Sequence, residues 1–221
     1  MPRDSAQTII PEELLQAYSL GYFPMAQNRD DKHVVWVLPD ERGALKLGDA
    51  RAPKKLKRFL ASEPFDVTIN TAFSELMSAC AEPGPGRRET WINDSIIEVY
   101  TELHRLGFAH SVECYDGGEL VGGLYGVAIG GIFCGESMFS RRTNASKIAM
   151  LHLIARLKLG GFSILDTQFY SDHLSQFGVT EIPDAEYQKM LSTHLDDEAD
   201  FQRASDRLSA TTVLQSITQR S

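Results

Sequence analysis

Residues 110–140 read HSVECYDGGELVGGLYGVAIGGIFCGESMFS and alternate strand-like runs with pairs of glycines. The runs at 110–115, 119–127 and 132–135 are rich in β-branched and aromatic residues, which favour extended structure. The turns between them contain Asp116-Gly117-Gly118 and Gly130-Gly131, and glycine adopts the conformations that tight hairpins require. The segment therefore predicts three consecutive antiparallel strands.

A helix and a further strand are expected directly after this hairpin region. Thr143 or Asn144 can cap a helix that runs to about Leu159, and Gly160-Gly161 ends it. The next run, residues 162–165, has the composition of a buried strand. A strand, helix and strand in succession form a locally parallel pair through a right-handed crossover.

The predicted fold class is α+β, with a mixed, mainly antiparallel sheet and packed helices. The glycine-rich turns and the late crossover resemble the acyltransferase fold of the N-acetyltransferase superfamily. Toward the N-terminus we expect a helix at 11–18, a short strand at 34–38 and a basic helix at 54–60. The Pro/Gly-rich loop that begins at Glu82 is the best boundary, which gives a small N-terminal α/β domain (1–82), an acetyltransferase-like catalytic domain (83–195) and an acidic tail (196–221). We expect the tail to be partly disordered or a peripheral helix.

Composition is typical of a globular protein, with 43% hydrophobic and 24% charged residues among 221. The sequence has no apolar run long enough for a membrane span and no secretory signal, so a cytoplasmic location is the default expectation. The formal net charge of −8 opposes indiscriminate nucleic-acid binding, although the basic segment permits contact with RNA on one face. A solvated helix face is the alternative for this segment, whose phosphate-binding candidates are Lys54, Lys55, Lys57 and Arg58, with Arg87 and Arg88 as further members.

Several segments of the chain, in the same order and spacing, resemble the leucyl/phenylalanyl-tRNA protein transferases. The resemblance runs from about Leu14 to Leu191, and the Gly-Glu-Ser-Met-Phe-Ser block at 135–140 is its most specific part. The matching segments are Gly21–Met25, Trp91–Ile92, His110–Glu113, Leu120–Val127, Phe133–Ser140, Asn144–Lys147 and Leu165–Gln168.

The resemblance implies a set of roles for individual residues. Asp166 and Gln168 are expected at the reaction centre, Glu136 is expected to orient the substrate, and Trp36 and Trp91 are expected to flank the 3′ end of the tRNA. Asp166 and Gln168 follow a buried strand, where an α/β sheet opens its ligand crevice. Strand-end hydrogen bonding is the alternative for the two polar residues, and core packing is the alternative for the tryptophans.

The implied activity transfers leucine or phenylalanine from aminoacyl-tRNA to the N-terminal amine of proteins that begin with arginine or lysine. An apolar pocket with the candidate walls Leu124, Phe133, Met138 and Leu153 suits such donors, and core packing is the alternative for all four. The family has methionine and phenylalanine at the positions of Leu124 and Leu153, so the resemblance leaves the preference among leucine, phenylalanine and methionine donors open. We expect no cofactor, no metal and no membrane partner, and the sequence leaves the oligomeric state open.

The aminoacyl ester is already activated, so the site needs geometry more than a strong base. We hypothesise that the amide oxygen of Gln168 aligns the attacking amine and that Asp166 orients that amide. A coenzyme-A-dependent N-acyltransferase is the main alternative function, but residues 142–147 lack the glycines that let a backbone approach a pyrophosphate. A non-catalytic RNA-binding module leaves Glu136, Asp166 and Gln168 unexplained. A serine hydrolase would need a second glycine in its nucleophile turn.

Overall fold

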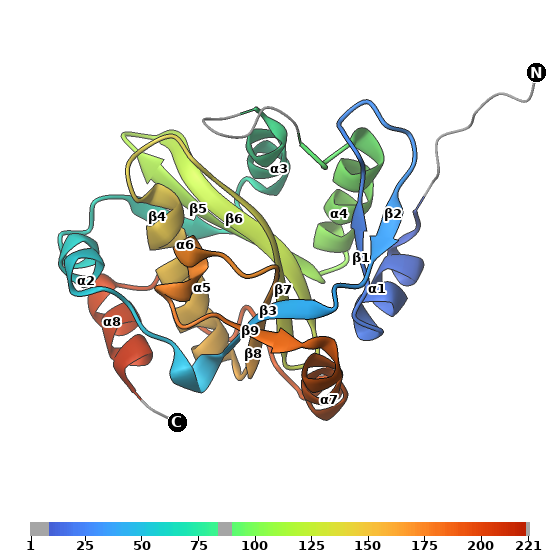
Figure 1. The fold of residues 1–221 in the computed structure, drawn as a ribbon. Helices are drawn as coiled ribbons and strands as arrows, with labels where there is room; N and C mark the ends of the chain where they lie inside the picture. The colour runs from blue at the N-terminus through green and yellow to red at the C-terminus, as the bar shows by residue number, and fades with distance from the viewer. Residues whose placement is uncertain (1–8, 84–89, 220–221) are drawn as a thin grey trace, which may run out of the picture.

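The computed structural model describes residues 9–83 and 90–219, and it is built on one seven-stranded sheet (Figure 1). The strand order is β4-β5-β6-β7-β8-β3-β9. Only the β7–β8 pair is parallel among these described strands, and α5 makes the crossover between its members. The strands are β3 (Glu41–Lys46), β4 (Asp66–Ile69), β5 (Ala109–Asp116), β6 (Glu119–Ile129), β7 (Ile132–Ser140), β8 (Ile164–Gln168) and β9 (Thr180–Pro183).

Helices cover both faces of the sheet and enclose two apolar cores. One core contains residues of α1 (Pro11–Ser19), α3 (Phe73–Ala81), α4 (Asp94–Arg105) and α7 (Asp184–His194). The other contains residues of α2 (Lys54–Ala61), α5 (Ala145–Gly160) and α8 (Ala210–Thr218). A short helix, α6 (Asp172–Ser175), follows β8, and a separate two-stranded sheet pairs β1 (Phe23–Met25) with β2 (Val35–Val37). The predicted α+β class with a mixed, mainly antiparallel sheet is confirmed.

The expected hairpins form where the sequence places them. Gly117, Gly118 and Gly130 all have positive φ angles, the conformation that glycine adopts without steric cost. The third strand continues to Ser140, five residues beyond its expected end at 135, because the polar block after Gly135 still pairs with β6. The short strands β3, β4 and β9 and the helix α3 were not expected, since runs of four to nine residues with interrupted patterns carry little periodic signal.

The sheet contains strands from both sides of the expected domain boundary at 82/83. β3 and β4 precede it, yet β3 pairs with β8 and β4 pairs with β5. The division of the chain into two domains at residues 82/83 therefore stays a prediction. The sheet itself continues across that boundary. Most of the loop expected there, residues 84–86, lies outside the described residues, as do Arg87 and Arg88.

The segment expected as a loose acidic tail ends in a helix that belongs to the packed structure. α8 lies against α5, and the Phe201 ring stacks on Phe133 with centroids 5.6 Å apart. The buried guanidinium of Arg156 donates to the backbone carbonyls of residues 201, 204, 205 and 206. The alternative of a helix is therefore correct for residues 210–218. Among the described residues, no helix combines the length and apolarity that a bilayer crossing requires.

Substitution of Gly126 tests how closely β6 and β7 approach each other. A Cβ at this position would overlap the carbonyl oxygen of Cys134 and lie 2.5 Å from the Phe133 ring. We predict that Gly126→Ala lowers the free energy of unfolding by about 1–3 kcal/mol, the usual cost of overpacking, as measured by urea denaturation. Gly48→Ala is the matched control because a Cβ there meets no atom within 4 Å. Equal stability of the two variants would contradict the account.

Candidate active site

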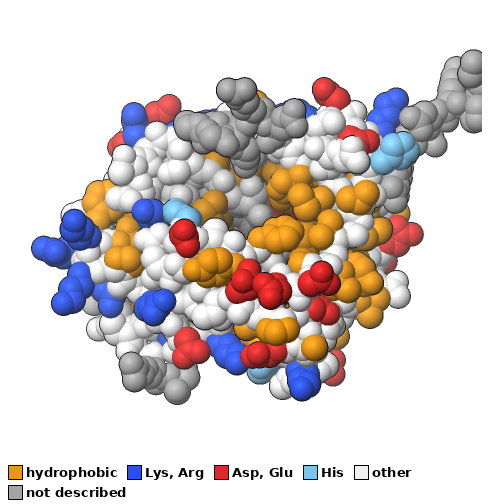
Figure 2. All heavy atoms as spheres, viewed as in Figure 1, with side chains coloured by type: hydrophobic (Ala, Val, Ile, Leu, Met, Phe, Trp, Pro, Cys, Tyr) orange, Lys and Arg blue, Asp and Glu red, His pale blue; other side chains and the backbone are white. Residues whose placement is uncertain are grey.

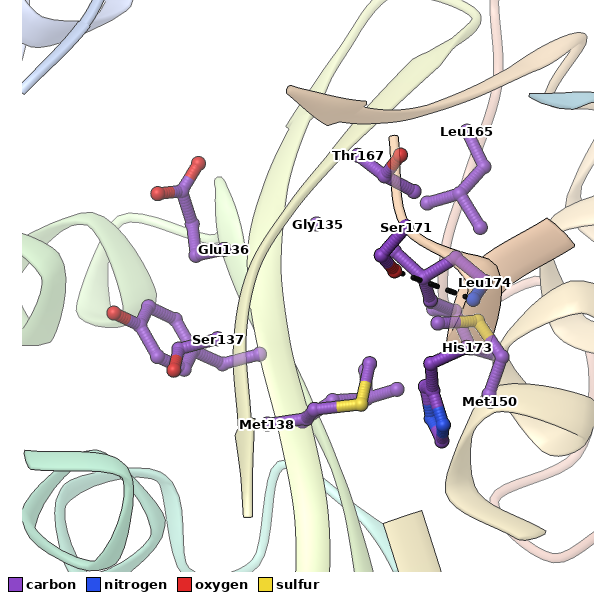
Figure 3. Close-up of a pocket in the computed structure, with 13 residues that line it drawn as sticks. Gly135, Glu136, Ser137, Met138, Met150, Leu165, Thr167, Ser171, His173 and Leu174 are labelled. Atoms are coloured by element: carbon purple, nitrogen blue, oxygen red, sulfur yellow. Dashed lines mark hydrogen bonds between the residues drawn. The ribbon is translucent and has the colours of Figure 1, made fainter. Parts of the chain in front are cut away.

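A cavity of about 320 Å³ opens between β6, β7, the end of β8, α5 and α6 (Figure 3). Its apolar wall contains Leu124, Met138, Met150, Leu153, Leu165 and Leu174. Glu136 and Ser137 lie on one side of it, while Thr167, Ser171 and His173 lie on the other. The cavity therefore combines an apolar wall with one carboxylate, an arrangement that suits a small organic group carrying a charged or polar end.

Glu136 belongs to the lining of this cavity and lies at a bulge in β7. Tyr125 pairs with Ser137 and Gly126 pairs with Gly135, so Glu136 is the extra residue that faces no partner on β6. A bulge of this kind re-aims a side chain and often lies at a functional site. The sequence contains a hint of it at Gly126, where a Cβ would collide with the Cys134 carbonyl and the Phe133 ring.

Two tyrosines and a glutamine hold the Glu136 carboxylate. The Tyr18 hydroxyl donates to Oε1 at 2.5 Å, and the Gln168 side-chain amide donates to the same oxygen at 2.9 Å. The Tyr100 hydroxyl donates to Oε2 at 3.1 Å and also contacts the Tyr18 hydroxyl. Burial raises the pKa of Glu136 to about 7, against the lowering effect of the two tyrosine hydrogen bonds.

Asp166 lies deeper and has no contact with solvent. Its Oδ1 faces the Arg42 guanidinium at 3.3 Å and accepts the Gln168 backbone N–H at 2.8 Å, while Oδ2 accepts the Tyr187 hydroxyl at 2.8 Å. Burial raises the pKa of Asp166, whereas Arg42 and these hydrogen bonds lower it. The guanidinium also donates to the Gly21 carbonyl and lies over the Tyr187 ring at 4.2 Å.

Gln168 is held in an unusual backbone conformation. Its φ of 55° lies in the left-handed region, which costs free energy for a residue with a side chain. The hydrogen bond from its N–H to Asp166 stabilises this conformation, and the side-chain amide then points at Glu136. The expectation that Asp166 orients the Gln168 amide therefore needs a correction, since Asp166 binds the backbone of Gln168 and Glu136 binds its side chain.

The structure brings most of the expected site residues together, with one exception among the pocket walls. Leu124, Met138 and Leu153 line the cavity. Phe133 does not, because it packs against Phe162 and Phe201 in the core on the α5 side of the sheet. Sequence reasoning missed the pairing of Arg42 with Asp166 and the tyrosines at Glu136, whose partners lie far away in the chain. It also missed the wall residues Met150, Leu165 and Leu174.

The two tryptophans lie outside the cavity, near the N-terminal helix. Trp36 is partly exposed on β2 and borders an open hollow with Leu20 and Tyr22, while Trp91 is half-buried against the core. Apolar side chains gather on the side of the molecule that carries α1, β1 and β2, and basic side chains gather over α2 at the opposite edge (Figure 2). Lys54, Lys55 and Arg58 are exposed there and Lys57 is partly so.

Comparisons with known proteins place the chain in a family. The leucyl/phenylalanyl-tRNA protein transferase model matches residues 44–192, and the model of that family's N-terminal domain matches residues 8–40. The leucyl/phenylalanyl-tRNA–protein transferase of Maricaulis maris is 50% identical over 210 residues, covering 95% of this chain and 97% of its own. The transferase of the same name from Paramagnetospirillum magneticum is 54% identical over 190 residues, 86% of this chain and 91% of its own.

A solved structure, L-PGS from Bacillus licheniformis, is 11% identical with a TM-score of 0.38, and the match covers 93% of this chain and 69% of that one. The sequence matches define an aminoacyl-tRNA-dependent transferase. The chain belongs to the leucyl/phenylalanyl-tRNA protein transferase family.

Removal of the Arg42 charge tests the buried ion pair. We predict that Arg42→Met lowers the free energy of unfolding by about 3–5 kcal/mol, because it leaves Asp166 buried without its counter-charge. Lys46→Met on the same strand is the matched control, since its pair with Glu186 is exposed and contributes at most about 1 kcal/mol. Chemical denaturation measures both. A loss for Arg42→Met no larger than that for Lys46→Met would show that the pair does not anchor the site.

Proposed function

We propose that this protein transfers leucine or phenylalanine, with methionine as a further donor, from aminoacyl-tRNA to the N-terminal α-amine of proteins that begin with arginine or lysine. The product carries a new peptide bond and an N-terminal residue that marks it for degradation. The observation that supports this proposal most strongly is the apolar cavity beside Glu136 in a chain of this family.

The cavity suits the donor amino acid. Its wall consists of leucine and methionine side chains, which accept unbranched and aromatic groups with little discrimination by shape. We place the donor side chain against Leu124, Met150 and Leu153, with its ester group at the end of the cavity where Glu136 lies. Phe133 is left out of this binding site because of its position in the core.

The tRNA has two candidate contact regions on the described surface. The terminal adenosine can stack on an aromatic face, and Trp36 offers a partly exposed one on the N-terminal side of the molecule. Lys54, Lys55, Lys57 and Arg58 on α2 supply positive charge for backbone phosphates in an otherwise acidic protein. Trp91, which is half-buried, is the weaker of the two aromatic candidates.

The reaction needs alignment of an amine with an activated ester. Holding two reactants in attack geometry and stabilising the developing oxyanion each contribute several kcal/mol. Gln168 has a neutral amide without basic strength, so its role is to orient groups, and its fixed backbone suits that role. The net charge of −8 favours the approach of a cationic N-terminal segment.

A transfer assay tests the proposed function. We expect the pure protein to move labelled leucine from leucyl-tRNA to a peptide that begins with arginine or lysine, and to leave a peptide that begins with glutamate unmodified. Acetyl coenzyme A is the comparison donor, because the alternative function is coenzyme-A-dependent acylation. Acetylation of the peptide without transfer from the tRNA would overturn the proposal in favour of that alternative.

Leu124→Phe tests the place of the donor side chain. The larger ring should narrow the cavity and reduce kcat/KM for phenylalanyl-tRNA about tenfold more than for leucyl-tRNA, since one methylene in a pocket is worth about 1–3 kcal/mol. Phe133→Leu is the control, and we expect it to alter stability but not the ratio of the two donors. If the ratio of kcat/KM for the two donors changed in Phe133→Leu but not in Leu124→Phe, the donor side chain would bind elsewhere.

A further inference from the structure

We infer that the Glu136 carboxylate is the group that takes the proton from the acceptor amine, and that Tyr18 and Tyr100 are positioning residues that hold it for this task. The inference rests on the proposed function and assigns one step of it. It moves the proton acceptor away from the Asp166–Gln168 pair.

Access to the cavity separates Glu136 from the other two polar candidates. In the described part of the chain, Glu136 lines the cavity, whereas Asp166 and Gln168 do not. Asp166 is wholly buried, and both of its oxygens are engaged by Arg42, Tyr187 and the Gln168 backbone. A substrate amine that enters the cavity therefore meets the carboxylate of Glu136 first.

The hydrogen bonds around Glu136 leave it capacity for a further donor. Oε1 accepts from both Tyr18 and Gln168, while among the described residues Oε2 accepts a hydrogen bond from Tyr100 alone, at 3.1 Å. An ionised carboxylate has about four lone-pair directions, so Oε2 can accept an ammonium N–H as well. The carboxylate cannot rotate away from the cavity because three side chains from α1, α4 and β8 fix it.

The charged and titratable groups that face Glu136 come from every element packed against it. They are Tyr18 from α1, Arg42 from β3, Tyr100 from α4, Cys134 from its own strand and Asp166 from β8. Arg42 and Asp166 form an ion pair, so Glu136 is the carboxylate without a paired cation in this set. With its pKa of about 7, it accepts and releases a proton near neutral pH.

The acceptor ammonium transfers one proton to Glu136, and the neutral nitrogen attacks the ester carbonyl carbon to form the C–N bond. The tetrahedral intermediate collapses, the bond from carbon to the ribose oxygen breaks, and that oxygen takes a second proton from the nitrogen. The products are the peptide bond and the free 3′ end of the tRNA. Glu136 then returns its proton to solvent.

Glu136→Gln tests the inference, because the amide keeps the shape of the side chain but cannot take a proton. Its oxygen can still accept from Tyr18 and Gln168, and its NH2 group can donate to the Tyr100 hydroxyl. We expect single-turnover transfer of leucine to an arginine-initiated peptide to fall about 15- to 30-fold at pH 6.5, because only about 3–6% of an amine with a pKa of about 7.7–8.0 is neutral at that pH. The deficit should shrink by about tenfold or more toward pH 9, where the acceptor amine, with a pKa of about 7.7–8.0, is already neutral. A wild-type to variant ratio that stays constant with pH would overturn the inference and leave Glu136 as an orienting group.

Two further variants separate proton transfer from a loss of structure. Tyr100→Phe removes a hydrogen bond to the charged carboxylate, so it should raise the pKa of Glu136 and move the acid limb of the rate to higher pH. An unmoved limb would count against the role of the tyrosine. Glu113→Gln is the matched control, a buried glutamate on β5 whose partners are Ser111, Thr68 and Thr71. We expect it to leave the pH dependence unchanged.

The wild-type protein provides the check on the proposed function itself. If the wild type fails to transfer leucine at any pH, the proposed function fails. If the wild type transfers leucine but the ratio to Glu136→Gln stays flat, only the proton-acceptor role of Glu136 fails.

Discussion

The Asp166 carboxylate lies where no water reaches it, and the arrangement of the site follows from the way the fold compensates its charge. An isolated buried carboxylate would be very costly, so the chain must bring a cation and several donors to it. Arg42 comes from the N-terminal part, Tyr187 from α7 and the Gln168 N–H from the end of the same strand. These contacts connect segments far apart in the sequence and fix the backbone turn that aims the Gln168 side chain at Glu136.

Two bulges complete the site beside this ion pair. Glu136 is the unpaired residue of the bulge in β7, and Thr167 lies at a register shift where Gly43 and Ala44 pair with Gln168 and Asp166. The two strands are neighbours and run parallel, so the bulges bring residues of both to the same edge of the cavity. The two carboxylates then differ by environment. Asp166 is neutralised by Arg42 and holds the backbone of Gln168 in place. Glu136 belongs to the cavity lining and can act on a substrate.

The sequence predicted the elements with strong local signals. The glycine pairs marked the hairpins between β5, β6 and β7, and the helix that follows them ends at the expected Gly160-Gly161. The family resemblance supplied Glu136, Asp166 and Gln168, and the structure brings these three together through the hydrogen bonds that Gln168 makes to both carboxylates. Local patterns could not show that Arg42 pairs with a residue 124 positions away. They also could not show that Phe133 packs on Phe162 and Phe201 within the core and away from the cavity lining, because that depends on how distant segments pack.

The central claim is that the cavity and the Glu136 carboxylate form one binding site for the reacting ends of both substrates. A crystal structure with an amide-linked leucyl-adenosine analogue, which cannot hydrolyse, tests it most directly. We predict that the leucine side chain lies against Leu124, Met150 and Leu153 and that the carbonyl group lies beside Glu136. An analogue bound with its leucine outside the cavity, for example in the open hollow at Trp36, would contradict the account.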